Sequence, residues 1–337
     1  MLISEPLVTV LVPSYNHESF IEERIKSILK QTYRSFELIV IDDNSPDKSH
    51  QKIIGLRKLY EFRYIKNRNN KGTFSSWGEI CKLARGKYLW ICESDDLAYP
   101  NFLEEAVKRL ESKTSASIFY CNSEVINDQG ECIGTTLDYF HNIWKSKRWD
   151  NNFSAKGIDE LNKFQIKGQT VPNMSSALLR FDDFTKAYSP FLRKFRNTGD
   201  WLLIGKLLKF GDVEFHSGIL SKFRKHSNTT TEKIESATSQ AEFIHTKFIL
   251  FKLSSIKREK FLEIFSNDVV RFLYENATPK MLFNKMMKIS FANSLQIFII
   301  TIFYLIKNPS YLKKFHRKYS EVKDYKRNIS KQNRNKQ

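Results

Sequence analysis

The acidic segment Glu93-Ser94-Asp95-Asp96 is the part of the sequence whose residue types most directly suggest chemistry. It follows an apolar run and precedes Pro100. Carboxylates on alternate residues at the end of a strand can face one site, because side chains alternate between the two faces of a strand. Mg²⁺ prefers such oxygen ligands and usually binds one or two carboxylates together with substrate phosphates. The segment therefore predicts a cation site that would neutralise a departing diphosphate. The alternative is a solvated acidic turn in which Asp96 caps the next helix.

Two more polar clusters follow apolar runs near the N-terminus. In the segment Pro13–Asn16, the side chains of Ser14 and Asn16 can hydrogen-bond to the edge of a base or a ribose, or they can form a turn after the proline. Asp42 and Asp43 can accept hydrogen bonds from a base imide or a ribose hydroxyl, or they can close an Asx turn. Each cluster thus admits a ligand-binding interpretation and a purely local one.

Two single residues further along the chain offer additional chemistry. Asp200 comes just before the helix that we expect to begin at Trp201, and Asp is a preferred N-cap residue. A carboxylate at a helix start is also kept ionised by the helix dipole, which suits a fixed general base. His226 stands in a basic loop after a strand-like run, where it is either polar surface or a metal ligand. The residue types are compatible with both roles at each position.

Alternating strands and helices must position these residues. Apolar runs predict strands at Val8–Val12, Phe36–Ile41, Arg63–Lys66, Tyr88–Cys92 and Ser117–Val125. Apolar residues at helical spacing predict helices between them, around 21–29, up to about 60, over 73–84 and around 103–110. Such repeated units indicate an α/β fold with a mostly parallel sheet. Ligands bind beyond the carboxyl ends of the strands in these sheets, and all three polar clusters lie there.

The pattern weakens after residue 130 into a stretch that we expect to be rich in loops up to residue 172. It resumes with a strand near 174–180, a helix through Leu208 and a strand at 213–223, and from about 235 the chain is largely helical. We therefore expect an α/β domain at 1–230, a helical extension at 231–306 and a basic tail at 307–337.

The composition excludes several classes of protein. Apolar residues make up 41% of the 337 residues and aromatic residues 14%, which is far too many for a disordered chain. The 12 glycines form neither a Gly-x-Gly pair nor a Gly-Lys-Ser/Thr motif, so the dinucleotide fingerprint and the P-loop are absent. The four cysteines lack zinc-site spacing, and we expect reduced, structural thiols in the cytosol. We also expect no signal peptide, because the first residues have no basic region or cleavage site.

The positive charge is concentrated at the C-terminus. The formal net charge is +18, and residues 307–337 carry +9 of it. Just before them, Ile289–Ile306 has no charged residue. This run has fewer apolar residues than the roughly 20 that a bilayer-spanning helix needs. An apolar helix followed by a cationic tail is typical of peripheral contact with an anionic membrane. A buried terminal helix with a solvated tail is the alternative. Nothing else in the chain supports nucleic acid as a partner of the tail.

In this order along the chain, the clusters resemble the nucleotide-sugar-dependent glycosyltransferases of family 2, which have the GT-A fold. The resemblance covers roughly residues 6–230. The segments that carry it are Val10–Asn16, Ile28–Thr32, Phe36–Ser45, Asn70–Gly72, Ala84–Tyr88 and Glu93–Asp96 with Pro100. It implies a GT-A domain, with a Rossmann-like, mostly parallel sheet flanked by helices, followed by a helical C-terminal extension.

The resemblance also implies roles for individual residues. Pro13, Tyr15 and Asp43 would hold the uridine end of a UDP-sugar. Asp95 and Asp96 match the Asp-x-Asp region, which meets the ribose, the diphosphate and a Mn²⁺ or Mg²⁺ ion, and Glu93 stands where many relatives have Asp. The expected nucleotide-sugar site comprises Pro13, Ser14, Tyr15, Asn16, Asp42, Asp43, Glu93, Ser94, Asp95 and Asp96.

Two further motifs complete the resemblance. Thr198-Gly199-Asp200-Trp201 resembles the acidic motif that supplies the catalytic base. Phe223-Arg224-Lys225-His226 resembles an aromatic-Arg-x-His segment, whose His can join Asp95 on the metal. The implied reaction is a single inverting displacement, in which the acceptor hydroxyl gives its proton to Asp200 and UDP departs.

Relatives with this layout extend lipid-diphosphate-linked saccharides for O-antigen or capsule. The resemblance therefore implies a cytoplasmic enzyme on the inner face of the cell membrane, with UDP-glucose as the expected donor. UDP-galactose or a UDP-N-acetylhexosamine is the alternative donor, and a soluble or protein acceptor is the alternative acceptor. A noncatalytic nucleotide-binding or polyanion-binding protein is a remote alternative.

Overall fold

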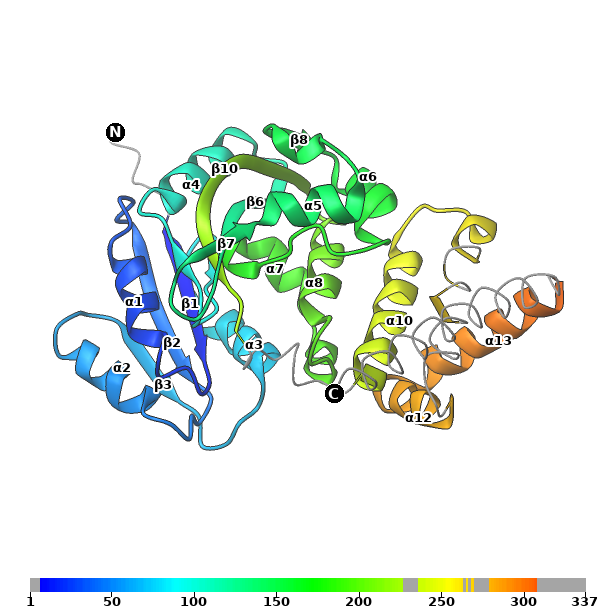
Figure 1. The fold of residues 1–337 in the computed structure, drawn as a ribbon, viewed down its shortest axis with the longest axis horizontal. Coiled ribbons are helices and arrows are strands. Elements are labelled where there is room, and N and C mark those ends of the chain that lie inside the picture. The colour runs from blue at the N-terminus through cyan, green and yellow to red at the C-terminus, as the bar shows by residue number, and fades with distance from the viewer. Residues whose placement is uncertain (1–6, 227–235, 263–264, 266–267, 270–278, 308–337) are drawn as a thin grey trace, which may run out of the picture. The chain divides into compact units, whose positions relative to one another are not determined.

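The computed structural model describes residues 7–226, 236–262, 265, 268–269 and 279–307 (Figure 1). The chain divides into two compact units. The first comprises residues 1–234 with 252–255, and the second comprises residues 235–251 with 256–337. The expected boundaries at 230/231 and 306/307 remain predictions, and the basic tail after Lys307 lies outside the described residues.

A mixed sheet forms the centre of the first unit. Its strands follow the order β3-β2-β1-β4-β9-β6-β10-β5, with β7 added beside β6 and β8 beside β10. Every strand of that order except β9 and β5 runs in the same direction, so the predicted mostly parallel α/β sheet is confirmed. The strands are β1 Val8–Ser14, β2 Phe36–Asp42, β3 Arg63–Lys66, β4 Tyr88–Ile91, β5 Leu97–Ala98, β6 Ala116–Ile126, β7 Cys132–Thr135, β8 Phe153–Ala155, β9 Ala177–Arg180 and β10 Asp212–Arg224.

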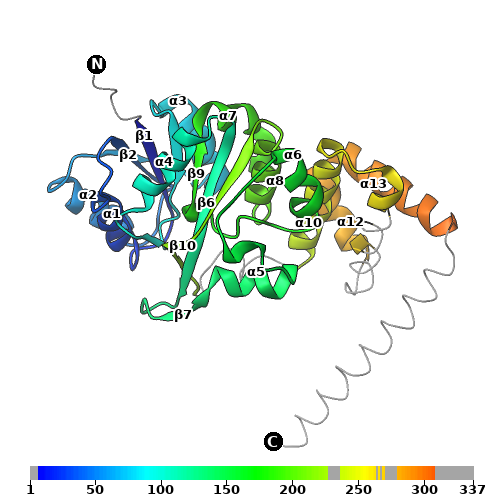
Figure 2. The same cartoon turned by 90° about the horizontal axis from the view of Figure 1, so that it is seen from above.

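Helices cover both faces of this sheet. They are α1 Ile21–Leu29, α2 Ser49–Arg57, α3 Thr73–Leu83, α4 Phe102–Ser112, α5 Thr136–Trp144, α6 Gly157–Glu160, α7 Phe181–Ala187 and α8 Gly199–Leu207. Short helical turns lie at η1 Arg148–Asp150, η2 Leu161–Gln165, η3 Met174–Ser176 and η4 Pro190–Lys194. Helix α1 packs on one face, whereas α3 and α7 lie together on the other (Figure 2).

The core explains why the strands appear in the sequence as continuous apolar runs. All seven residues of β1 are buried, because helices cover both faces of the sheet. On one face, Val10 and Val12 pack with α1, and Trp90 stacks on Phe102 of α4 with ring centroids 4.5 Å apart. Cys92 and Cys121 are buried, Cys81 is half-buried and Cys132 is exposed, and all four are free.

The stretch 130–172 differs from the expected loops. It contains α5, α6 and η2, and α5 begins with a capping box in which Thr135 and Asp138 bond reciprocally. These helices are short, and aromatic rings hold them, such as the stacked pair Phe140 and Trp149 at 4.6 Å. The four residues of α6 and the five of η2 do not repeat a helical period long enough to be recognised in the sequence.

The second unit is helical where it is described, with α10 Ser236–Leu253, α12 Pro279–Ile289 and α13 Phe291–Lys307. The uncharged run 289–306 is therefore divided between the last residue of α12 and helix α13. No helix in the described part of the chain combines the length and the apolar character that crossing a membrane requires.

Candidate functional site

The three polar clusters meet at the carboxyl edge of the parallel strands. Strand β1 lies between β2 and β4, so the loops that leave these three strands are neighbours. The Asp43 backbone N–H donates to the Ser14 carbonyl at 2.8 Å, and the Asn16 N–H donates to Ser45 Oγ at 3.1 Å. His17 Nδ1 lies 2.7 Å from Ser94 Oγ. The expected convergence of the first, second and fourth strand ends is thus present.

The Pro13–Asn16 segment closes β1 and turns sharply away from the sheet. Ser14 is buried, and its hydroxyl has no hydrogen-bond partner among the described residues. Tyr15 is 45% exposed, so its ring is accessible to a ligand. Asn16 adopts a φ of 58°, in the left-handed region that Asn tolerates better than most residues. The segment therefore combines a local turn with an exposed ring and an unused hydroxyl.

The carboxylates of Asp42 and Asp43 both accept hydrogen bonds from other residues of the protein. Asp42 accepts hydrogen bonds from the Ser45 N–H at 2.9 Å and the Tyr64 hydroxyl at 3.1 Å, and burial together with Asp42 raises the pKa of Tyr64. Asp43 accepts bonds from Asn67 Nδ2 at 2.7 Å and from the N–H of Gly72 at 2.7 Å.

The N–H of Lys71 also donates to both Asp43 oxygens, at 2.9 Å each. Gly72 has a φ of 83°, a conformation that favours glycine, and it is the N-cap of α3. The Asp43 carboxylate thus fixes the loop that opens α3, and its contact with a uracil base remains a prediction.

The 93–96 segment contains the two carboxyl groups of the site whose pKa values are raised. Burial and the neighbouring charges of Asp95, Asp96 and Asp200 raise the pKa of Glu93 well above its usual value. Burial and Asp95 likewise raise the pKa of Asp96 to about 7. A cation beside Asp95 would lower this mutual repulsion between the carboxylates.

Asp96 does not cap a helix, contrary to one of the two interpretations of the segment. The N-cap of α4 is Asn101, and Asp96 Oδ1 instead accepts a hydrogen bond from the backbone N–H of Arg224 at 2.9 Å. The Arg224 side chain donates to the Asp95 carbonyl at 2.8 Å and to Glu23 at 2.9 Å. Arg224 is buried and thus joins the end of β10 to the acidic loop, a positioning role that the sequence motif did not specify.

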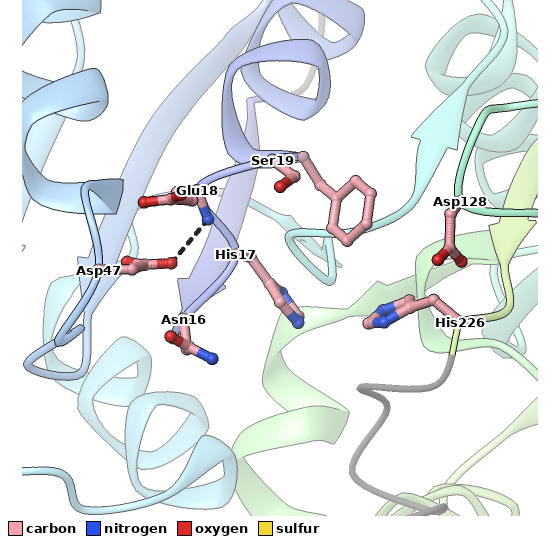
Figure 3. A pocket seen from close by; sticks show the side chains of 8 residues that line it. Asn16, His17, Glu18, Ser19, Asp47, Asp128 and His226 are labelled. Carbon is pink, nitrogen blue, oxygen red and sulfur yellow. Dashed lines mark hydrogen bonds between the residues drawn. The ribbon is translucent and has the colours of Figure 1, made fainter.

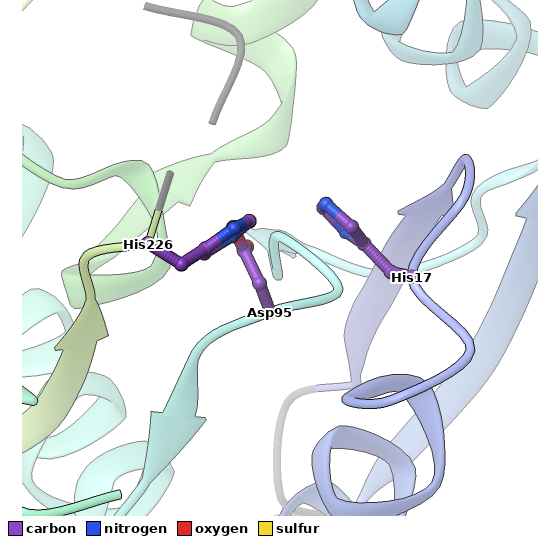
Figure 4. A group of neighbouring side chains, drawn as sticks. All are labelled: His17, Asp95 and His226. Atoms are coloured by element: carbon purple, nitrogen blue, oxygen red, sulfur yellow. The ribbon is translucent and has the colours of Figure 1, made fainter. Parts of the chain in front are cut away.

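Asp95 and His226, the two expected metal ligands, are in contact. His226 Nε2 lies 3.1 Å from Asp95 Oδ2. Burial alone would raise the pKa of Asp95, but the hydrogen bond with His226 and the charge of His17 hold it below its usual value. Ligand atoms of His17, Asp95 and His226 all lie within 4.8 Å of one another, and the three side chains point toward a common space (Figure 4).

His17 is the member of this cluster that the sequence did not reveal. A single His after Asn16 has no spacing that suggests a metal site, and its partner Ser94 is 77 positions away. The ring centroids of His17 and His226 lie 5.6 Å apart in an edge-to-face arrangement, and both rings line an open pocket of about 390 Å³ (Figure 3). Asn16, Phe20 and Asp128 also line this pocket.

Asp200 lies inside the first turn of α8 rather than at its N-cap, which is Thr198. The expected helix start at Trp201 was two residues late. Asp200 Oδ1 accepts a hydrogen bond from the Trp201 N–H at 2.7 Å, and Oδ2 accepts one from Gln169 Nε2 at 2.7 Å. Its carboxylate is thus held at both oxygens, and its charge acts on Glu93.

Residues of the stretch 130–172, which was expected to be rich in loops, position Asp200. Gln165 Nε2 donates to the Trp201 carbonyl at 3.0 Å, and Trp201 Nε1 donates to the Gln165 carbonyl at 2.7 Å. Tyr139 donates its hydroxyl to the Gln169 carbonyl at 3.1 Å. Gln165 and Gln169 were not among the expected site residues, because their role depends on tertiary contacts.

Sequence comparisons point to one family. The family model described as "Glycosyl transferase family 2" matches residues 9–169. An uncharacterized glycosyltransferase of Rickettsia felis is 26% identical over 280 residues, covering 82% of this chain and 44% of the relative. An Escherichia coli protein is 34% identical over 122 residues, covering 36% of this chain and 47% of the relative. It is named UDP-Glc:alpha-D-GlcNAc-diphosphoundecaprenol beta-1,3-glucosyltransferase WfgD. The matched part of the chain spans less than half the length of these two relatives.

Comparison of structures supports the fold. The crystal structure of S. aureus TarS 1-349 in complex with UDP-GlcNAc is similar with a TM-score of 0.64 and 15% sequence identity. The similarity covers 88% of this chain and 84% of that chain. The expected GT-A architecture of a mostly parallel sheet flanked by helices is therefore confirmed.

Proposed function

Because the chain belongs to glycosyltransferase family 2 through residues 9–169, we propose that it transfers a sugar from a UDP-sugar to an acceptor hydroxyl. The observation that carries this proposal is the cluster of His17, Asp95 and His226. Two residues before Asp95 lies Glu93, whose pKa is raised in part by the charge of Asp200. A cation ligand set and an anchored carboxylate base are the two parts that a displacement at a sugar diphosphate requires.

The donor atoms of the cluster fit a divalent transition metal. They comprise one carboxylate oxygen and two imidazole nitrogens, and imidazole suits transition metals better than Mg²⁺, which prefers oxygen ligands. Of the two expected ions, Mn²⁺ therefore fits this set better than Mg²⁺. When bound, such an ion supplies positive charge to the diphosphate of the leaving UDP.

The residues of the chain account for the rest of the reaction. The acceptor hydroxyl gives its proton to a carboxylate oxygen of Asp200 while its oxygen forms a bond to the anomeric carbon. The bond from that carbon to the diphosphate breaks, and UDP leaves with the electron pair. The two hydrogen bonds from Gln169 and Trp201 keep the Asp200 carboxylate in one orientation during this transfer. A single displacement of this kind inverts the anomeric centre and gives a β linkage from an α-linked donor.

The uridine end of the donor binds at the ends of β1 and β2. Tyr15 is exposed and offers a ring on which a base can stack, and the Ser14 hydroxyl offers an unused donor. Asp43 contributes by fixing the loop 67–72 and by accepting a hydrogen bond from the base.

We further propose UDP-glucose as the donor and a lipid-diphosphate-linked saccharide as the acceptor, in the synthesis of O-antigen or capsular polysaccharide. The name of the Escherichia coli relative, which specifies UDP-Glc and a diphosphoundecaprenol acceptor, supports this choice. UDP-galactose, a UDP-N-acetylhexosamine and a soluble or protein acceptor are the competing substrates. The enzyme would act in the cytoplasm on the inner face of the cell membrane, where such acceptors are anchored.

The test is UDP release by the purified full chain with a panel of UDP-sugars, Mn²⁺ or Mg²⁺, and a synthetic GlcNAc-diphosphate-lipid acceptor. The proposal predicts metal-dependent release that the acceptor stimulates, fastest with UDP-glucose and Mn²⁺. Faster UDP release with another UDP-sugar would identify that sugar, and not UDP-glucose, as the donor. Metal-dependent UDP binding without any release would exclude the proposed acceptor. Failure to bind UDP at all would contradict the proposed donor class.

A further inference from the structure

Helix α13 exposes an apolar face along its whole described length. Its exposed large side chains are Phe291, Leu295, Ile299, Ile302, Phe303 and Ile306, each between 45% and 69% exposed. At about 100° per residue, these six positions fall within an arc of about 120° around the helix. The face is therefore one continuous apolar stripe rather than six scattered residues, and we call it the α13 face.

The opposite side of the helix is the polar one, and it is buried. Ser294, Ile297 and Thr301 are at most 3% exposed. Ser294 Oγ lies 3.2 Å from His245 Nε2 of α10, and Thr301 Oγ1 donates to the Ile297 carbonyl at 2.8 Å. A helix that faces water has the reverse distribution, with its polar residues outside. The α13 face is thus built for an apolar environment.

The sequence segment that contains this helix carries charge of one sign. Residues 276–320, which include α12 and α13, contain eight Lys or Arg and no Asp or Glu. Anionic lipid headgroups attract such a segment, and a surface helix of this kind buries its apolar face at the boundary between headgroups and acyl chains. Two copies of the same cationic segment would repel each other, which disfavours a second copy of the chain as the partner.

We propose that the α13 face docks on the surface of an anionic lipid bilayer. The peripheral membrane location proposed above would then depend on one specific surface, the α13 face. It predicts that apolar insertion and cationic attraction act together, so binding requires the α13 face and weakens as salt rises.

The test is co-sedimentation of the full chain with vesicles of phosphatidylcholine alone and of phosphatidylcholine with phosphatidylglycerol. The test variant is Ile302→Gln with Ile306→Gln, at 53% and 69% exposure. The matched control is Ile133→Gln with Ile143→Gln, two isoleucines of the first unit at 59% and 57% exposure. Both pairs replace the same exposed residue type, so folding should be preserved in both.

The wild type and the control variant are expected to bind the anionic vesicles and to release them at high salt. The test variant should bind at least about tenfold more weakly, because two inserted side chains are lost. Failure of the wild type to bind anionic vesicles, or equal binding by the two variants, would overturn the proposal. So would a wild-type dimer in sedimentation velocity that the test variant converts to a monomer. Lipid binding is measured without sugar transfer, so this inference and the proposed reaction can fail independently.

Discussion

The two groups of carboxylates at the edge of the sheet differ in what surrounds them. Asp43, at the end of β2, accepts hydrogen bonds from Asn67, Lys71 and Gly72, all of which belong to a single loop. Asp95, after β4, instead meets the imidazoles of His17 and His226 and lies beside the carboxylates of Glu93 and Asp96. Both groups are acidic, follow a buried strand and lie within the same site.

This difference separates structural from chemical roles. A carboxylate that accepts several N–H donors from one loop holds that loop in place. Clustered carboxylates with raised pKa values are held in a state that a cation would stabilise. The comparison therefore assigns Asp43 mainly to the scaffold and the group around Asp95 to the reaction, and the variants below test that division.

The largest effect is expected from Asp200→Asn. The amide cannot accept the proton of the acceptor, so kcat should fall by about 10²–10⁴-fold while the Kd for UDP stays unchanged. Single-turnover transfer and UDP titration would measure the two quantities. An unchanged kcat would remove Asp200 as the base.

Asp43→Asn should act on stability. The amide keeps one acceptor oxygen and places an NH₂ group against the N–H donors of the loop 67–72, so the free energy of unfolding should fall by about 2 kcal/mol. Asp95→Asn should cost less, because the lost contacts with His226 and His17 are offset by relief of the repulsion with Asp96. Urea unfolding of both variants measures this free energy. Equal decreases in the two variants would contradict the assignment of Asp43 to the scaffold and of Asp95 to the reaction.

Gln169→Leu should lower kcat by about tenfold, because one hydrogen bond to a charged group contributes roughly 1.5 kcal/mol. The KM for the donor should not change, since the hydrogen bond of Gln169 is to Asp200. Lys167→Leu, at an exposed position two residues away, is the matched control. A rise in KM with an unchanged kcat would assign Gln169 to donor binding instead.

The smallest expected effect is on the free energy of unfolding and concerns Asp212 at the start of β10. Its carboxylate accepts hydrogen bonds from three neighbouring residues. Against the opposing effect of burial, hydrogen bonds from Ser115, Lys156 and Gly157 lower the pKa of Asp212 below its usual 3.8. The lowered pKa adds stability that is fully present above about pH 4 and is lost as the pH falls through the folded-state pKa.

Asp212→Asn should therefore cost about 1 kcal/mol at pH 7, and the difference from the wild type should shrink as the pH is lowered below 4. Thermal unfolding across pH 3–7 measures it. A difference that grows toward low pH would contradict the sign.

The N-terminal part of the fold was predictable from the sequence, and the reason is physical. Strands β1, β2 and β4 are buried on both faces, so they appear as continuous apolar runs between amphipathic helices. Their carboxyl ends carry the polar clusters, which made the convergence of the site predictable before any distance was known. The stretch 130–172 lacked such runs, because aromatic contacts between short helices hold it together.

The residues that were missed all act through contacts between distant parts of the chain. His17 joins Asp95 and His226 across 78 positions from Asp95, and Gln169 reaches Asp200 across 31. Neither a lone His nor a lone Gln has a spacing that suggests its partner. The N-cap assignment of Asp200 was wrong, because the helix begins two residues earlier than the apolar residues after Asp200 suggested.

The most direct test of the account is a titration of the full chain with Mn²⁺ in the presence of UDP, followed by electron paramagnetic resonance. One bound Mn²⁺ per chain is expected in the wild type and in Asp212→Asn, because Asp212 lies at the opposite end of β10 from His226. The Asp95→Asn variant should lose this ion. Retention of Mn²⁺ by Asp95→Asn, or its absence from the wild type, would contradict the claim that the cluster of His17, Asp95 and His226 is a metal site.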